Sequence, residues 1–258
     1  MSDINFDQLA ERFQRNIYGT TKGRIRLEIL RRDLTEVLAS ARNFENVKIL
    51  DAGCGMAQIS THLAEQGHHV VLNDVSKIML DAAQKSFEQK GMSQQYRLVC
   101  GPLQDLRAQH DAFFDLIMNH AVLEWTESPK QALDDLVYML KPGGYLSLMF
   151  YNIHSLVFRN LVRGNLYKVD RSDWAGTGEG SLTPINPLDP DEVFNWLEQH
   201  NMKILCKSGV RVFQDYMSRH NREHVSDDDI VATELKYSRQ EPYLHLGRYI
   251  HVVCQKFS

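Results

Sequence analysis

The sequence predicts an α/β protein built on a doubly wound, mostly parallel sheet. Two observations predict this class. Short apolar runs alternate with amphipathic stretches of helical length between residues 47 and 150, and a glycine-bearing turn, Gly53-Cys54-Gly55, follows the first apolar run. Strands that alternate with helices in this way pair in parallel through right-handed crossovers, which places helices on both faces of the sheet.

Five strands and three helices are expected in this region. Ser76 is a suitable N-cap for the second helix and Gly91 stands just past its end, while Ser128-Pro129 opens the third. Lys141-Pro142-Gly143-Gly144 is expected to be a turn before the fifth strand. The predicted strands are 47–50, 69–72, 96–100, 114–118 and 145–150, and the predicted helices are 57–66, 76–89 and 128–140.

The segments outside this core suggest one domain over residues 1–258, with two additions. Residues 1–44 are expected to form an N-terminal helical extension. Residues 151–190 are rich in glycine and proline, which predicts an inserted lid made of a short helix and a loop. After a helix to about residue 199, strands near 203–213 and 248–256, with a helix near 227–238 between them, are expected to close the sheet as an antiparallel hairpin.

Composition sets limits on the class of function. The chain has 258 residues, 43% of them hydrophobic and 24% charged, which fits an ordinary globular core. Its net charge of -4 argues against a strongly basic nucleic-acid-binding protein, although a local basic face remains compatible with it. It has no apolar run of 18 residues and no secretory signal, so we expect a cytoplasmic protein without a membrane span.

The cysteines and histidines favour structural roles. The four cysteines show no C-x-x-C spacing, and three lie in apolar, strand-like runs, which predicts buried free thiols in a reducing compartment. The 11 histidines lack metal-ligand spacing, so no metal site is expected.

The glycine turn predicts a site for an anionic ligand. Glycine removes side chains where a ligand approaches the backbone, and the helix that follows offers free N–H groups to a pyrophosphate or an amino acid carboxylate. Gln58 occupies the position where the dinucleotide pattern needs a third glycine. Asp74, at the end of the second strand, can accept both hydroxyls of a ribose, and Gln104-Asp105 after the third strand can meet an adenine edge.

Together these residues resemble the class I S-adenosylmethionine-dependent methyltransferases over about 45–150. Asp51 to Gly55 is similar to their first motif, Asp74 to their second, and the Lys-Pro-Gly-Gly turn to a late motif, whereas Ala57 replaces a third glycine. The resemblance implies a Rossmann-like fold, S-adenosylmethionine as the cofactor, and methyl transfer. The competing interpretation is a degenerate domain that binds no cofactor.

Segments outside the core resemble a narrower family, the bacterial tRNA 5-carboxymethoxyuridine methyltransferases. That family esterifies the carboxylate of a modified uridine at the wobble position, position 34, so the resemblance implies tRNA as the partner, bound through its anticodon loop. The segments are RNIYGTTKG at 15–23, HAVLEW at 120–125, LMFYN at 148–152, GVRVF at 209–213, RQEPY at 239–243 and LGRYIHV at 246–252. The cofactor contacts implied by position are Arg26, Gly53, Cys54, Gly55, Asp74, Leu103, Gln104 and His120.

The chemistry of this reaction predicts an arginine clamp. A carboxylate is already ionised at pH 7, so the enzyme needs orientation and desolvation rather than a general base. Arg211 and Arg248 are the candidates, because the planar guanidinium matches a carboxylate; a strand-edge position in water is the competing interpretation for each. Tyr151 is the third catalytic candidate. For Tyr18, Tyr151, Tyr216 and Tyr249, base stacking or hydrogen bonding competes with core packing.

Segment 12–32 carries seven basic residues and few acids, so either a phosphate-facing patch or a solvated helix face is expected there. The predicted substrate-binding residues are Arg15, Tyr18, Lys22 and Tyr249. Two other functions compete with tRNA methylation. One is a small-molecule O- or C-methyltransferase, which needs no basic face, and the other is a cofactor-binding regulator without catalysis. The sequence leaves the oligomeric state open.

Overall fold

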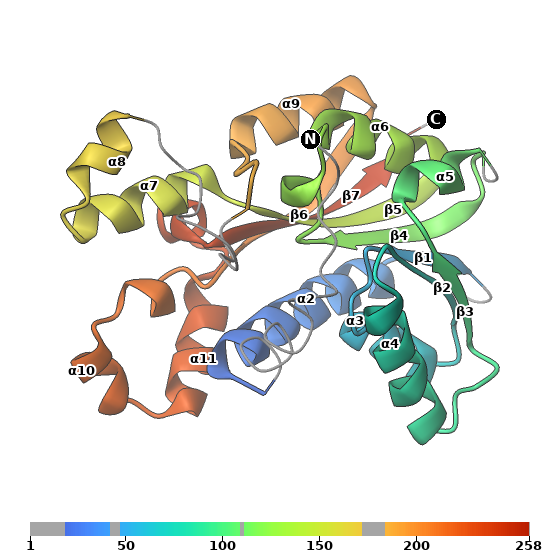
Figure 1. The fold of residues 1–258 in the computed structure, drawn as a ribbon, viewed down its shortest axis with the longest axis horizontal. Helices are drawn as coiled ribbons and strands as arrows, with labels where there is room; N and C mark the ends of the chain where they lie inside the picture. Colours follow the sequence, from blue (N-terminus) through green and yellow to red (C-terminus); the bar gives the residue numbers. More distant parts are fainter. Residues whose placement is uncertain (1–18, 42–46, 109–110, 172–183, 258) are drawn as a thin grey trace.

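Seven strands, in the order β3-β2-β1-β4-β5-β7-β6, make one sheet from the described residues of the computed structural model (Figure 1). The described residues are 19–41, 47–108, 111–171 and 184–257. The strands are β1 (Lys48–Ala52), β2 (His69–Asp74), β3 (Tyr96–Cys100), β4 (Phe114–His120), β5 (Leu140–Tyr151), β6 (Met202–Val210) and β7 (Tyr249–Lys256).

The first five strands run parallel and the last pair closes the sheet antiparallel, which confirms the predicted fold class and the predicted hairpin. Because β7 runs against both of its neighbours, β6 points the same way as β5. The carboxyl ends of β1 to β6 and the start of β7 therefore lie along one edge of the sheet. Ligands of open α/β sheets bind at this edge.

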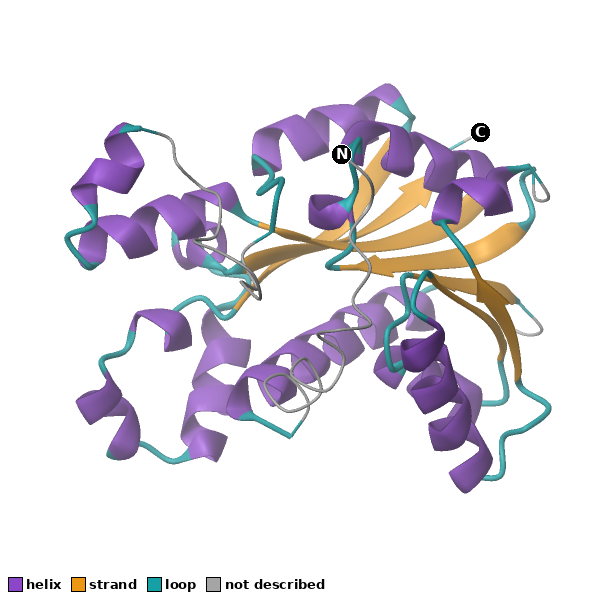
Figure 2. Ribbon diagram, viewed as in Figure 1, coloured by secondary structure: helices purple, strands orange, loops and turns teal. Residues whose placement is uncertain are grey.

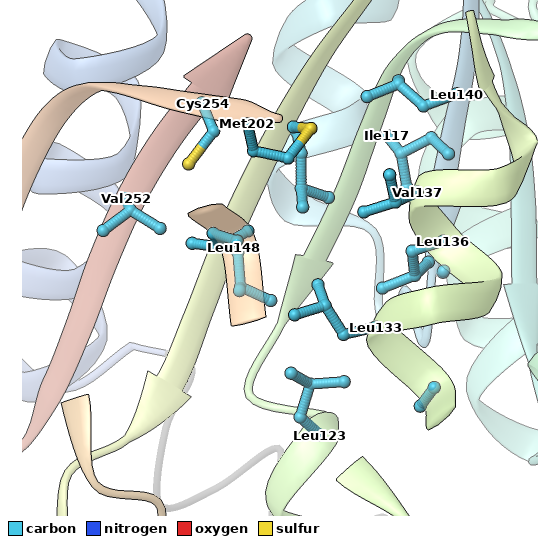
Figure 3. Packing of buried hydrophobic residues seen from close by; sticks show 14 of the residues in the cluster. Ile117, Leu123, Leu133, Leu136, Val137, Leu140, Leu148, Met202, Val252 and Cys254 are labelled. Atoms are coloured by element: carbon cyan, nitrogen blue, oxygen red, sulfur yellow. The ribbon is translucent and has the colours of Figure 1, made fainter. Parts of the chain in front are cut away.

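Helices cover both faces of the sheet (Figure 2). One face carries α5 (Leu103–Arg107), α6 (Pro129–Met139) and α9 (Pro190–Gln199); the other carries α2 (Thr21–Ala39), α3 (Gln58–Glu65), α4 (Lys77–Gln89) and α11 (Asp227–Tyr237). Apolar side chains fill the space on the α6 face, where Leu133, Leu136 and Val137 pack against Ile117 and Leu148 of the sheet (Figure 3). Ser76 caps α4 as predicted, its Oγ accepting from Met79 N at 3.2 Å.

Three further helices and three 3₁₀ turns complete the described part of the chain. They are the helices α7 (Ile153–Val162), α8 (Leu166–Asp170) and α10 (Arg219–Glu223), and the 3₁₀ turns η2 (Leu123–Trp125), η3 (Gln214–Tyr216) and η4 (Tyr243–Leu246).

Three expectations differ from the structure. The Lys-Pro-Gly-Gly segment is a bulge inside β5, because Phe114 pairs with Leu140 and Leu116 with Tyr145. Residues 153–170 are more helical than expected, since α8 follows α7. The four cysteines are free, as predicted, but of these thiols only Cys254 is buried; Cys54 and Cys206 are half-buried, and Cys100, which ends an outer strand, is exposed. The N-terminal extension is described only from residue 19, where α2 follows at once, and residues 172–183 of the insertion lie outside the described part.

Candidate active site

The glycine turn after β1 lies tightly against its neighbours. Gly53 has φ +72°, and a Cβ there would come within 2.4 Å of a methyl carbon of Val122. The backbone nitrogens of Gly53 and Cys54 donate to the carbonyl of Asn73 at 2.8 and 2.9 Å, which ties the turn to the end of β2. Only glycine satisfies both the positive φ and the close approach, so the turn keeps the space beside it free for a ligand.

Four of the predicted cofactor residues line one small pocket beside this turn: Arg26, Gly53, Cys54 and His120. Arg26 comes from α2, and its Nη2 donates to the carbonyl of His120 at 3.2 Å. Gln58, at the start of α3, also lines the pocket, and the N-cap of this helix makes no side-chain hydrogen bond. A guanidinium and a helix N-terminus together suit a carboxylate, such as that of an amino acid.

The other predicted cofactor residues lie farther along the same edge. The carboxylate of Asp74 accepts from Gly55 N at 2.8 Å and from Ser76 N at 2.9 Å, so it holds the second glycine of the turn and opens α4. Leu103 and Gln104 begin α5, Leu103 buried and Gln104 exposed. The structure thus spreads these residues over the ends of β1, β2 and β3, as the ends of an extended nucleoside ligand require.

Burial shifts the protonation of several groups here toward the neutral form. It raises the pKa of Asp51 to about 7, although a hydrogen bond from Ser60 opposes the shift, and it raises the pKa of Glu124 to about 8. Burial, with help from His251 and Arg26, lowers the pKa of His120 well below its ordinary value. It also raises the pKa of the Cys54 thiol, so this cysteine is no thiolate nucleophile at neutral pH.

A buried polar chain runs from α2 to the pocket. Asp33 Oδ2 lies 2.8 Å from His251 Nδ1, His251 Nε2 lies 2.9 Å from Ser147 Oγ, and that hydroxyl lies 2.8 Å from His120 Nε2. All four side chains are buried. Sequence reasoning missed this chain, because its members stand on α2, β4, β5 and β7 and show no common spacing.

The structure brings the predicted clamp residues together around one acid. Asp215 lies 3.5 Å from the guanidinium of Arg211, 3.9 Å from that of Arg248 and 3.7 Å from the Lys22 ammonium. Arg159, on α7, interacts electrostatically with Arg248, Tyr151 and Asp215. We call Lys22, Arg159, Arg211 and Arg248 the cationic cluster.

Among the described residues, the cationic cluster has more positive charge than Asp215 can balance. Burial tends to raise the pKa of Asp215, but Arg211, Arg248 and Lys22 outweigh it and hold this pKa below its ordinary value. Burial and the nearby Arg248 lower the pKa of Arg159, and its buried Nε has no hydrogen-bond partner in the described part of the chain. Four cations beside one carboxylate favour a further anion.

Backbone geometry explains why Arg211 and Arg248 meet. Arg211 follows β6 and Arg248 precedes β7, and the Arg248 nitrogen donates to the Arg211 carbonyl at 3.3 Å. A Cβ on Gly247 would lie 2.6 Å from the Cα of Gly209, so the two Gly-containing segments approach too closely for larger residues. Arg211 itself has φ +63°, an uncommon conformation for a non-glycine residue.

Tyr151 and Tyr249 stand beside these guanidinium groups. Their rings meet edge to face at 5.4 Å, with Arg248 4.8 Å from the Tyr151 ring centre and Arg211 5.4 Å from that of Tyr249. The Tyr151 hydroxyl is buried and has no hydrogen-bond partner within the described residues. Tyr216 instead donates to Leu246 O at 2.7 Å, a structural role.

Among the remaining predictions, Arg15 and Tyr18 lie outside the described residues. Lys22 is in the cationic cluster, whereas Arg24, Arg31 and Arg32 of the same basic segment pair with acids, namely Asp228, Glu28 and Asp33. Sequence reasoning missed Arg159 and Asp215. Their positions along the chain gave no signal, because a four-residue spacing pairs opposite charges on a helix and residues 211–213 are not helical.

The pocket and the cationic cluster share helix α2. Arg26 lines the pocket and Lys22 pairs with Asp215. A spacing of four residues puts these two side chains on one helix face, one turn or about 6 Å apart. A ligand at the glycine turn and an anion at the cationic cluster would therefore be neighbours.

Residues 50–148 match the methyltransferase domain family. A tRNA 5-carboxymethoxyuridine methyltransferase from Escherichia coli (strain K12) is 43% identical over 256 residues, which cover 99% of this chain and 97% of that one. The chain belongs to the tRNA 5-carboxymethoxyuridine methyltransferase family. The predicted resemblance is thereby confirmed.

More distant relatives share less. A ubiquinone biosynthesis O-methyltransferase from Xylella fastidiosa (strain 9a5c) is 30% identical, covering 74% of this chain and 71% of its own. A protein from Pyrococcus horikoshii OT3 superposes with a TM-score of 0.66 at 16% identity, over 98% of this chain and 100% of that one. A methyltransferase in complex with the Trm112 activator from Haloferax volcanii superposes with a TM-score of 0.62 at 15% sequence identity, over 98% of this chain and 96% of that one. The two structures establish the fold alone.

The described residues contain no group of three or more His, Cys, Asp or Glu side chains placed to hold a metal ion. None of the helices among them is long and apolar enough to cross a membrane.

Proposed function

We propose that this protein transfers the methyl group of S-adenosylmethionine to the carboxylate of 5-carboxymethoxyuridine at position 34 of tRNA, forming the methyl ester. The observation that carries the proposal is the cationic cluster, which lies one helical turn from the pocket of Arg26 and His120. Family membership supplies the tRNA substrate, and the cluster supplies a reason for an anionic acceptor. The proposal places the reaction in the cytoplasm.

The residues at the strand ends fit the cofactor. Arg26 would hold its carboxylate, the Gly53 turn would leave room for its backbone approach, and Asp74 would accept its ribose hydroxyls. Gly55, Leu103 and Gln104 would border the nucleoside. When bound, S-adenosylmethionine supplies an electrophilic methyl group on a sulfonium.

The chain's own residues then orient the acceptor and exclude water. The substrate carboxylate arrives ionised, so no side chain needs to remove a proton. The guanidinium groups of Arg211 and Arg248 lie 3.5 and 3.9 Å from Asp215, too far for good hydrogen bonds, so their donors are available to a substrate carboxylate. Tyr151 and Tyr249 would frame the base beside them.

The arrangement along the chain belongs to the same proposal. Residues 1–258 would act as one methyltransferase domain, with 1–44 as an N-terminal extension and 151–190 as an insertion beside the site. Arg15 and Tyr18 would join Lys22 in holding the substrate.

The test is methyl transfer in vitro. The purified protein is given labelled S-adenosylmethionine and two versions of one tRNA, with either 5-carboxymethoxyuridine or plain uridine at position 34. We expect label only in the modified tRNA, because plain uridine offers no carboxylate. Equal labelling of the two tRNAs, or labelling of neither, contradicts the proposal.

A second candidate is O-methylation of a small molecule, favoured by the 30% identity to ubiquinone biosynthesis O-methyltransferases. Such an acceptor has a neutral hydroxyl, so it would not need four clustered cations to bind it. A competition assay decides between the two: a quinol precursor should not slow methylation of modified tRNA.

A further inference from the structure

A second basic feature lies on α7 and α8, beyond the carboxyl end of β5 (Figure 1). Residues 153–171 contain Arg159, Arg163, Lys168 and Arg171 but one acid, Asp170, in a chain whose net charge is -4. We call Arg163, Lys168 and Arg171 the α7–α8 basic face. A segment of opposite sign to the rest of the protein points to an anionic partner.

In the described part of the chain the α7–α8 basic face has no acidic partner, in contrast to most of the basic residues of α2. Among the described residues, none of its three side chains forms an ion pair with a carboxylate, whereas Arg24, Arg31 and Arg32 of α2 each do. Arg163 and Arg171 are exposed. The basic side chains of α2 are therefore mostly paired with acidic side chains of the protein, whereas those of the α7–α8 basic face are available to a partner.

The α7–α8 basic face continues the cationic cluster. Arg159 belongs to the cluster and Arg163 stands one helical turn further along α7, close enough for the two like charges to interact. Like charges at this spacing destabilise a helix. A bound polyanion that runs from the cluster along α7 would remove this repulsion.

Apolar and aromatic side chains are interspersed with these cations. Val162, Leu166 and Tyr167 are 58%, 55% and 60% exposed, and Leu161 is 45% exposed. Cations that alternate with exposed aromatic and apolar side chains suit single-stranded RNA, which offers phosphates to the former and unstacked bases to the latter.

We infer that the α7–α8 basic face binds the sugar–phosphate backbone of the anticodon loop on one side of the modified nucleotide. The inference rests on the proposed function, because it needs tRNA at the cationic cluster. The modified base would occupy the cluster, and the neighbouring nucleotides would follow α7, with Tyr167 and Leu166 beside their bases. The face therefore contributes affinity for the loop and leaves the transfer step itself unchanged.

The test compares two triple variants that remove equal charge. One is Arg163→Ala/Lys168→Ala/Arg171→Ala. The matched control is Lys85→Ala/Arg97→Ala/Lys130→Ala, three cations that are exposed and have no carboxylate ion pair in the described part of the chain. We expect the first variant to raise the KM for modified tRNA by roughly 10-fold or more, with kcat and affinity for S-adenosylmethionine unchanged, and the control to match the wild type.

Salt dependence gives a second readout. Each phosphate contact to a single strand contributes about 0.7 to the slope of log affinity against log salt, so losing three should reduce the slope by about 2. The charge-keeping variant Arg163→Lys/Arg171→Lys should retain both the slope and the KM. Far-ultraviolet circular dichroism and thermal unfolding check that α7 and α8 still fold.

The outcomes separate the two proposals. If the wild type binds tRNA but methylates none, the proposed function fails. If the wild type methylates modified tRNA and the α7–α8 variant keeps its KM and salt slope, the inference about this face is overturned. Loss of binding to anionic lipid vesicles with unchanged tRNA binding would overturn it too, in favour of a membrane surface.

Discussion

Arg211 combines an unfavourable backbone with a charged side chain in a crowded place. Its φ of +63° costs a non-glycine residue on the order of 1 kcal/mol, and the protein accepts this cost beside three other cations. The Arg211 carbonyl accepts from Arg248 N, so the backbone conformation of one arginine fixes the position of the other.

Replacing either arginine by lysine tests the clamp. Arg211→Lys and Arg248→Lys keep the charge but lose the planar fork, so single-turnover methylation of modified tRNA should slow by roughly 10- to 100-fold, the range for losing a charged hydrogen bond. Affinity for S-adenosylmethionine should survive, because neither residue lines the pocket of Arg26 and His120.

Two results would contradict this assignment. Wild-type rates in both lysine variants would move the clamp elsewhere, and loss of cofactor binding in both would make the two arginines structural.

Asp74 is predicted to bind the cofactor ribose while it holds the glycine turn through Gly55 N. Asp74→Ala should weaken S-adenosylmethionine by about 1.5–3 kcal/mol, measured by calorimetry. Asp81→Ala on α4 removes a surface carboxylate of an exposed ion pair and should leave the affinity unchanged. Equal affinities in the wild type and both variants would remove Asp74 from the ribose site.

Sequence motifs were sufficient for residues whose position follows from a strand end. Gly53 and Asp74 belong to this kind, since parallel strands bring their carboxyl ends to one edge, whereas Arg211 and Arg248 were chosen for the chemistry of the guanidinium group. Arg159 and Asp215 were not predicted, because their role depends on the way α7 and η3 pack against the sheet. The same holds for His251, whose partner Asp33 is 218 residues away.

At the scale of elements, α2 connects three features. Lys22 reaches the cationic cluster, Arg26 the pocket, and Asp33 the buried chain to His120. Burial tends to raise the pKa of Asp33, but the hydrogen bond and charge of His251 and the charge of Arg32 outweigh it and hold the pKa below its ordinary value.

Asp33→Asn should therefore destabilise the protein by about 1.5–3 kcal/mol in urea unfolding at pH 7, because the buried position loses its charged hydrogen bonds with Arg32, Arg239 and His251. A lowered pKa stabilises the fold above the ordinary value of 3.8, so the advantage of the wild type should persist down to about pH 4 and shrink below it. Glu36→Gln, which removes the exposed partner of Arg239, should cost at most about 1 kcal/mol. Equal losses in both variants would contradict the account.

Glu124, in η2, should give a pH dependence of opposite sign. Burial raises its pKa to about 8, so folding keeps a proton that the unfolded chain loses above about pH 4.5. Relative to Glu124→Gln, the wild type should lose about 1.4 kcal/mol per pH unit between pH 5 and 8. Urea unfolding of both proteins at several pH values measures this, and parallel pH profiles would show that Glu124 does not titrate in this range.

The elements themselves were predicted where the pattern was local. The parallel strands, the Ser76 cap and the closing hairpin follow from apolar periodicity and turn residues. The bulge at Lys141 to Gly144 was not predicted, because Gly-Gly is typical of a turn. Only the pairing of Leu140 with Phe114 shows that β5 begins before these glycines. α8 was missed because five residues carry little helical periodicity.

At the scale of the whole molecule, charge is segregated. The chain is acidic overall, yet the cationic cluster and the α7–α8 basic face lie together beyond one end of the sheet. Such an arrangement directs a polyanion to that end and repels it elsewhere. The net charge of -4 therefore does not argue against tRNA binding, because the positive charge at the binding surface determines the attraction to a polyanion.

Nucleoside mass spectrometry of tRNA tests the central claim most directly. The tRNA is taken from cells that lack this gene, from the same cells carrying the wild-type gene, and from cells carrying Arg211→Lys. The account predicts free 5-carboxymethoxyuridine without the gene, its methyl ester with the wild type, and reduced ester with the variant. If tRNA from the cells that lack the gene contains as much methyl ester as tRNA from the cells with the wild-type gene, the account is contradicted.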